Sequence, residues 1–311
     1  MAKIKGHQHY IPRFYLKGFT EPNYEDYIWV YEKGKTEPIK LHIKNVAVQK
    51  HYYSFTDHNG EKNITIEDAL AEIEGKTAPV FQKIKKHDDL NEDDRINFSY
   101  FLSTMITRVP NFRENMNNIY KDNINKAIEQ IEPYIKNDKK NYVKPINLPE
   151  EFWNSMWNDM PEKAEEKLQD IYLKSDKKTV KPEITLKFLD LPREEPASIF
   201  NNMKWKFIVA TDNWKFVTSD NPLHNYLDIG LLNKNVEVIF PVSKDLVFLG
   251  TWQDNKEGRY FQADNNTVKE FNRATVKSAL KYVYSSNNSD GLMRLVQKYK
   301  DNAPKIQITQ L

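Results

Sequence analysis

Two histidines separated by one residue lie near the start of this 311-residue chain, in the segment His7-Gln8-His9-Tyr10-Ile11-Pro12. Alternate side chains of an extended segment point to the same side, so the imidazoles of His7 and His9 are predicted to face one direction. Such a pair could bind a metal ion or share proton transfer. The simpler alternative is a solvent-facing arm, docked by the apolar residues after Pro12.

Arg108 and Asp220 offer further chemistry. Arg108 follows an apolar helical pattern, where it could bind terminal helix carbonyls or hold a phosphate or carboxylate through two hydrogen bonds. Asp220 lies in Thr218-Ser219-Asp220-Asn221-Pro222, directly after an apolar strand pattern. A carboxylate there could be a metal ligand, a general base or the partner that orients a histidine, and the same residues are also ordinary turn chemistry.

Composition excludes several classes of site. The chain has no cysteine, so a disulfide, a thiolate zinc site, an iron–sulfur cluster and a cysteine nucleophile are impossible. No phosphate-binding loop, dinucleotide glycine fingerprint or nucleophile elbow is present. Lys and Arg total 46 against 44 Asp and Glu, for a net charge of +2. This balance argues against a protein coated in positive charge for long duplexes, but it allows a small basic cleft.

The start of the chain is charged and lacks the apolar core of a signal peptide. No run approaches the roughly 20 apolar residues that cross a bilayer. The sequence therefore predicts a soluble, cytoplasmic protein with no membrane partner.

The elements that must position these residues follow the order strands, a helical block, then strands and helices. Apolar and turn patterns predict a hairpin over 27–43 and a helix from Asn91 that breaks at Pro110. They also predict two joined strands over 205–218, a second pair over 236–250, and a helix over 265–284. We therefore expect a single α+β domain over 1–311, with N-terminal and C-terminal strands forming an antiparallel-rich sheet around a central helical block. A helical insertion is expected at roughly 111–203.

The motifs resemble those of a known family. The segment from Gln8 to Pro12, followed by Phe14-Tyr15-Leu16 and Phe19, is similar to the N-terminal signature of domain-of-unknown-function family forty-two thirty-eight, a bacterial, phage and fungal family. Later elements that resemble the family are Glu67, Ile73-Glu74, Arg108 with Pro110, Phe216 to Pro222, Phe240 to Ser243, and Asn272 through Tyr284. The resemblance covers roughly residues 6–287.

The resemblance implies specific roles for the polar signature residues. In the first hypothesis the protein is an intracellular hydrolase with nuclease-like phosphodiester cleavage. His9 then moves the proton, Arg108 stabilises transition-state charge, and Asp220 completes the catalytic set. Asp220, Glu67 and Glu74 are the candidate ligands of Mg²⁺ or Mn²⁺.

Two other hypotheses stay open. The protein could be a non-catalytic module that binds or senses a nucleotide or nucleic acid in a microbe–phage conflict, with Tyr10, Asn221 and Asn272 as binding residues. Alternatively the signature could be structural, with His9 and Asp220 paired to fix the N-terminal arm across the sheet.

Overall fold

The structure is a computed structural model that describes residues 7–53, 55–56, 62–63, 65–119, 122, 126, 194–225, 230–253, 259–302 and 304. The chain forms two compact units, one made of Met1–Arg113 with Leu186–Leu311 and the other of Glu114–Thr185. The helical insertion expected at 111–203 lies mostly outside the described residues and stays a prediction. None of the described helices is long and apolar enough to cross a bilayer.

One sheet has five strands. In spatial order they are β12 (Tyr260–Gln262), β7 (Lys204–Val209), β11 (Leu246–Thr251), β10 (Glu237–Ser243) and β9 (His224–Asn225). All neighbours are antiparallel except β12 and β7. The β10–β11 hairpin confirms the strand pair predicted over 236–250. Nearly every residue of β10 is buried, because both faces of this sheet are covered.

A four-stranded sheet joins the two ends of the chain. Its order is β3 (Ile39–His42), β2 (Tyr27–Glu32), β13 (Tyr282–Ser285) and β8 (Thr218–Ser219). The predicted N-terminal hairpin is confirmed, with Trp29 opposite Lys40, and β2 pairs on its other side with the C-terminal β13. The fold is therefore α+β with antiparallel-rich sheets, as the sequence predicted.

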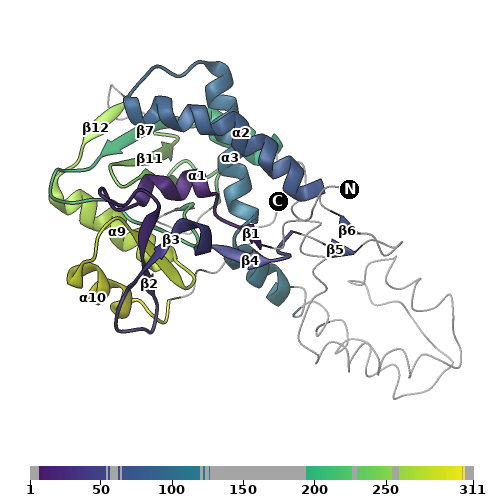
Figure 1. Ribbon diagram of the computed structural model, residues 1–311. Helices are drawn as coiled ribbons and strands as arrows, with labels where there is room; N and C mark the ends of the chain where they lie inside the picture. Colours follow the sequence, from purple (N-terminus) through teal and green to yellow (C-terminus); the bar gives the residue numbers. More distant parts are fainter. Residues whose placement is uncertain are drawn as a thin grey trace, which may run out of the picture. The chain divides into compact units, whose positions relative to one another are not determined.

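Helices α2 (Thr65–Lys86), α3 (Glu92–Thr107) and α8 (Glu194–Asn202) belong to the central block. Asn91 and Asp94 begin α3 with a reciprocal capping box, which satisfies two backbone donors. The chain leaves the helix at Arg108 and Val109 and becomes helical again at Pro110, so the predicted break is confirmed. Aromatic contacts such as Phe81 with Phe240 and Phe98 with Phe248 join α2 and α3 to one face of the five-stranded sheet (Figure 1).

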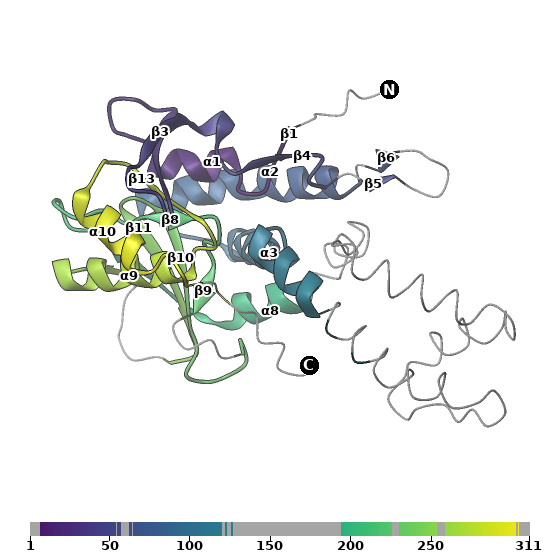
Figure 2. The same ribbon diagram turned by 90° about the horizontal axis from the view of Figure 1, so that it is seen from below.

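Helices α9 (Asn265–Ser278) and α10 (Asp290–Lys298) lie side by side near the β2–β3 hairpin (Figures 1 and 2). Val268 and Phe271 of α9 pack with Ile239 and Val247 of the five-stranded sheet. The far end of α9 and the buried face of α10 form another cluster with the four-stranded sheet. α9 thus lies between the two sheets.

Two sequence predictions of elements were wrong. The strands expected to pair over 205–218 belong to different sheets, β7 to the five-stranded one and β8 to the four-stranded one. The helix expected over 265–284 ends at Ser278, and the remaining residues lead into β13. In both cases long-range sheet pairing overrides local pattern.

Short elements place the N-terminal arm. β1 (His7–His9) pairs with β4 (Val48–Lys50), and α1 (Arg13–Leu16) and the 3-10 turn η1 (Lys17–Phe19) follow it. A second 3-10 turn, η2 (Ile43–Asn45), precedes β4, and β5 (Phe55–Thr56) pairs with β6 (Lys62–Asn63). Tyr15 joins the two large sheets, because its hydroxyl donates to the Pro241 carbonyl at 2.8 Å and lies 2.6 Å from the Thr218 hydroxyl.

Candidate functional site

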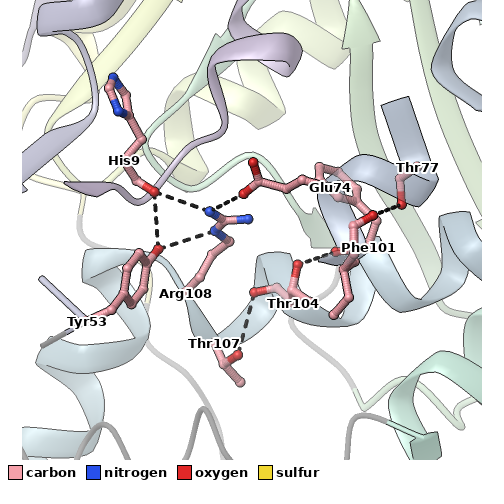
Figure 3. A network of polar contacts seen from close by, with 9 residues as sticks. His9, Tyr53, Glu74, Thr77, Phe101, Thr104, Thr107 and Arg108 are labelled. Atoms are coloured by element: carbon pink, nitrogen blue, oxygen red, sulfur yellow. Dashed lines mark hydrogen bonds and ion pairs between the residues drawn. The ribbon is translucent and has the colours of Figure 1, made fainter. Parts of the chain in front are cut away.

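Arg108 is the centre of a polar network at the end of α3 (Figure 3). Its Nη2 donates to the carbonyl oxygen of His9 at 3.2 Å and to Glu74 Oε1 at 2.8 Å. Its Nε donates to the hydroxyl of Tyr53 at 3.3 Å, and that hydroxyl donates to the same His9 carbonyl. The network joins the N-terminal arm to α2 and α3.

The guanidinium of Arg108 is buried, with a residue exposure of 2%. Burial disfavours its charged form, but Tyr53 and Glu74 outweigh that cost and raise the pKa of Arg108 above its ordinary value. A charge buried among fixed partners suits a structural role. The Nη1 of Arg108 is buried and has no hydrogen-bond partner among the described residues.

The side chain of His9 does not take part in this network. Figure 3 shows its imidazole turned away from Arg108 and Glu74, with only the backbone carbonyl facing them. Burial lowers the pKa of His9, and Glu74 opposes that effect. Burial thus favours the neutral form of the ring.

Gln8 fixes the same arm through its amide. Its Nε2 donates to Glu67 Oε2 at 2.8 Å, and its Oε1 accepts from the backbone N–H of Tyr53 at 2.7 Å. Glu67 and Glu74, predicted as metal ligands, are thus hydrogen-bonded to Gln8 and Arg108 respectively.

Asp220 binds backbone amides. Its two carboxylate oxygens accept from the N–H groups of Leu280, Lys281 and Tyr282 at 2.8–2.9 Å. Burial raises the pKa of Asp220 to about 6, and the three amide donors oppose that rise. The carboxylate therefore holds the segment that leads from α9 into β13.

Tyr10 lies between the two networks. It is buried, and its ring packs against Tyr52 with centroids 5.6 Å apart. Its hydroxyl interacts with that of Tyr284, and burial followed by the Asp220 charge raises the pKa of Tyr10. The ring of Tyr10, predicted as a binding residue, is thus packed in the core, and its role in binding stays a prediction.

Asn221 and Asn272 both bridge backbone segments. Asn221 Nδ2 donates to the carbonyl oxygen of Ser278 at 2.9 Å. Asn272 Oδ1 accepts from the N–H of Val217 at 3.0 Å, and its Nδ2 donates to the carbonyl oxygen of Lys215 at 2.9 Å. Asn221 thus fixes the C-terminal end of α9, and Asn272 fixes the middle of the helix to the segment 215–217.

The structure brings only some of the predicted catalytic residues together. Arg108 contacts the His9 backbone and Glu74, but within the described ranges no hydrogen bond or ion pair joins the His9 ring or Arg108 to Asp220. The His9–Asp220 pair of the structural hypothesis is replaced by the Arg108–His9 carbonyl contact. Catalysis by His9, Arg108 and Asp220 stays a prediction.

The described part of the chain holds no group of three or more His, Asp or Glu side chains arranged to bind a metal ion. Glu67, Glu74 and Asp220 each already have hydrogen-bond donors of the protein as partners. Their role as ligands of Mg²⁺ or Mn²⁺ remains a prediction.

A partly open pocket of about 440 Å³ lies between α9, α10 and the segment 213–217. This volume is in the range of small-molecule sites. Its lining residues are Asn213, Trp214, Lys215, Val217, Lys269, Asn272, Arg273, Ser285, Asn287, Ser289, Gly291, Leu292 and Leu295. Of the predicted binding residues, Asn272 lines this pocket and holds the Lys215–Val217 wall in place.

Among the described residues that line the pocket, three are cationic and none carries a carboxylate. Lys215 pairs with Asp245 and Arg273 pairs with Glu270, both at 2.8 Å. Lys269 lies over the ring of Trp214, with Nζ 4.6 Å from the centroid, and Trp214 is 40% exposed. A flat aromatic face beside a lysine suits a ligand with a planar ring and a negative charge.

Sequence reasoning missed Trp214, Lys269 and Arg273. A tryptophan within a polar turn, Asp212-Asn213-Trp214-Lys215, and cations four residues apart on a helix were the available signals. Neither was specific, because the pocket forms only where α9, α10 and the turn meet.

Comparison with known proteins gives one match. No curated protein and no solved structure matches the chain. A family model described as "Protein of unknown function (DUF4238)" matches residues 7–289, which include the arm, Arg108, Asp220 and the pocket. The chain therefore belongs to this family.

Proposed function

We propose that the protein binds a nucleotide in the pocket between α9, α10 and the segment 213–217. The exposed Trp214 ring carries the proposal, with Lys269 beside it and no carboxylate among the lining residues that the structure describes. Trp214 stacks on the base, and Lys269 and Arg273 contact the phosphate. The pocket is large enough for a small molecule and open enough to admit one.

The buried signature residues support this site indirectly. Asn272 holds Lys215 and Val217, while Asn221 and Asp220 hold the chain after α9. These hydrogen bonds are short, and the polar groups that form them are satisfied. They therefore fix the pocket walls, and the ligand contacts residues on the rim of the pocket. In this proposal Asn272, Asn221 and Asp220 hold the binding site in shape. The ligand mainly contacts Trp214, Lys269 and Arg273.

Titration calorimetry with deoxyadenosine monophosphate tests the proposal, with deoxyadenosine and inorganic phosphate as separate probes. Lys269→Gln should weaken binding of the monophosphate about tenfold, which corresponds to the loss of one charge-assisted hydrogen bond. Binding of deoxyadenosine should change little. Trp214→Ala should weaken binding of both base-containing probes.

The matched control is Lys86→Gln, an exposed lysine at the end of α2 that does not line the pocket. The affinity of this variant for deoxyadenosine monophosphate should equal that of the wild type. No measurable binding of the monophosphate to the wild type, or equal losses in Lys269→Gln and Lys86→Gln, would contradict the proposal.

Phosphodiester hydrolysis is a separate prediction from the sequence. Its test is cleavage of labelled nucleic acids with Mg²⁺ or Mn²⁺ by the wild type beside His9→Ala and Asp220→Ala. Loss of cleavage in both variants, with retained folding, would support it. A cytoplasmic location and a role in microbe–phage conflict likewise remain predictions.

A further inference from the structure

We infer that the ligand of this pocket is a single-stranded nucleic acid, whose backbone continues from the pocket along a row of cations on α9. The inference rests on the proposed nucleotide site and names the class of molecule that carries the nucleotide. Three observations support it: charge distribution, the direction of the two helices, and an aromatic ring beyond the pocket.

Positive charge is concentrated in this part of the chain. Residues 265–300 contain seven Lys and Arg against two Asp and Glu, whereas the whole chain has a net charge of only +2. The other residues together are therefore net negative. A local excess of cations on an otherwise balanced protein is the charge pattern of a polyanion site.

The cations form a row that leads away from the pocket. Lys269, Arg273 and Lys277 follow one another at intervals of four residues on α9, which places them on one side of the helix over about 12 Å. Lys269 and Arg273 line the pocket, and Lys277 lies beyond it. A mononucleotide in the pocket does not account for Lys277.

Helix α10 lies alongside this row of cations on α9. Residues within 269–273 of α9 and 291–295 of α10 line the pocket, and the C-terminal ends of the two helices meet where Lys277 Nζ lies 5.3 Å from the ring centroid of Tyr299, the residue after α10. Lys298 Nζ lies 5.7 Å from the same centroid. The row therefore runs along the junction of α9 and α10, which Figures 1 and 2 both show side by side.

These cations are available for phosphate. Arg273 shares its charge with Glu270, but no ion pair in the described part of the chain involves Lys269, Lys277 or Lys298. Their side chains are exposed, and each lies over an aromatic ring, so a phosphate can reach each ammonium group without breaking an ion pair.

A single strand fits better than a duplex. Trp214 in the pocket and the partly exposed Tyr299 beyond it offer two aromatic rings near the cations, and unpaired bases can stack on both. Bases inside a duplex are stacked on one another and reach neither ring. The two rings thus favour a strand whose bases are free.

The experiment compares a short single-stranded oligodeoxyadenylate with deoxyadenosine monophosphate by fluorescence anisotropy and calorimetry at several salt concentrations. The oligonucleotide should bind the wild type at least about tenfold more tightly. Lys277→Gln should reduce the salt slope for the oligonucleotide by about 0.7, the value for one phosphate contact in a single strand. Lys277→Gln should bind the monophosphate with the same affinity as the wild type. The control Lys86→Gln should match the wild type in binding both the oligonucleotide and the monophosphate.

Equal affinity and salt slope for the two probes, or an unchanged slope in Lys277→Gln, would overturn the inference while the nucleotide site stands. Tighter binding of the matching duplex would overturn it as well. Failure of the monophosphate to bind would instead remove the proposed function.

Discussion

Arg108 contacts the N-terminal arm through the backbone carbonyl of His9, with 3.2 Å between Nη2 and the oxygen. The imidazole of His9 points away from the guanidinium (Figure 3). The contact that fixes the arm therefore depends on Arg108 and not on the side chain at position 9. This separates two residues that the sequence motif places in one catalytic set.

Replacement of Arg108 should destabilise the fold far more than replacement of His9. Arg108→Gln removes the buried ion pair with Glu74 and shortens the reach to the His9 carbonyl, so we expect a loss of about 3 kcal/mol in the free energy of unfolding. His9→Ala keeps that carbonyl and should lose less than about 1 kcal/mol. Urea unfolding with an unchanged m-value measures both, and a larger loss in His9→Ala would show that the imidazole holds the arm.

Asp220 should make stability depend on pH. Its pKa in the folded protein is about 6, above the value near 3.8 of an ordinary aspartate, so the folded state binds more protons between these values. The stability contributed by this group is then complete below about pH 4 and falls as pH rises to about 6. Relative to that of Asp220→Asn, the free energy of unfolding of the wild type should fall by on the order of 3 kcal/mol between about pH 4 and about pH 6.

The measurement is the free energy of unfolding of both proteins at several pH values between 4 and 7. The free energy of unfolding of the wild type could instead rise with pH relative to that of Asp220→Asn. This result would show that the three amide donors outweigh burial and lower the pKa of Asp220.

Two glycines should respond oppositely to alanine. A Cβ on Gly18 would lie 3.0 Å from the carbonyl oxygen of Val242, in a packed contact between η1 and β10, and should cost about 1–3 kcal/mol. A Cβ on Gly75, within α2, meets nothing within 4 Å and should stabilise the protein by about 0.5–1 kcal/mol. Thermal unfolding of Gly18→Ala and Gly75→Ala measures the change in melting temperature that each substitution causes. Equal changes would contradict the close approach of η1 to β10.

Local signals in the sequence were sufficient for several elements. Asn91 with Asp94 marks the start of α3, and Lys33-Gly34-Lys35 marks the turn between β2 and β3, because capping and turn chemistry act over a few residues. The α+β class followed from the order of such segments.

The partners of distant segments were not predictable from local pattern. β8 joins β13 and not β7, and the residues after Ser278 leave α9 to form β13. The polar motif residues were found by type, but their roles depend on direction: the carboxylate of Asp220 faces backbone amides, and the ring of His9 faces away from Arg108. The pocket around Trp214 depends on three segments meeting in space, which local pattern does not encode.

The position of β13 between β2 and β8 has a consequence for synthesis on the ribosome. The β2–β3 hairpin emerges early, but the strand that covers the open edge of β2 is complete only when Ser285 has been added. At about 5–20 residues per second, the nascent chain carries an unpaired apolar strand edge for on the order of ten seconds or more. We therefore expect a chain that terminates before Tyr282 to aggregate more readily than the full-length chain.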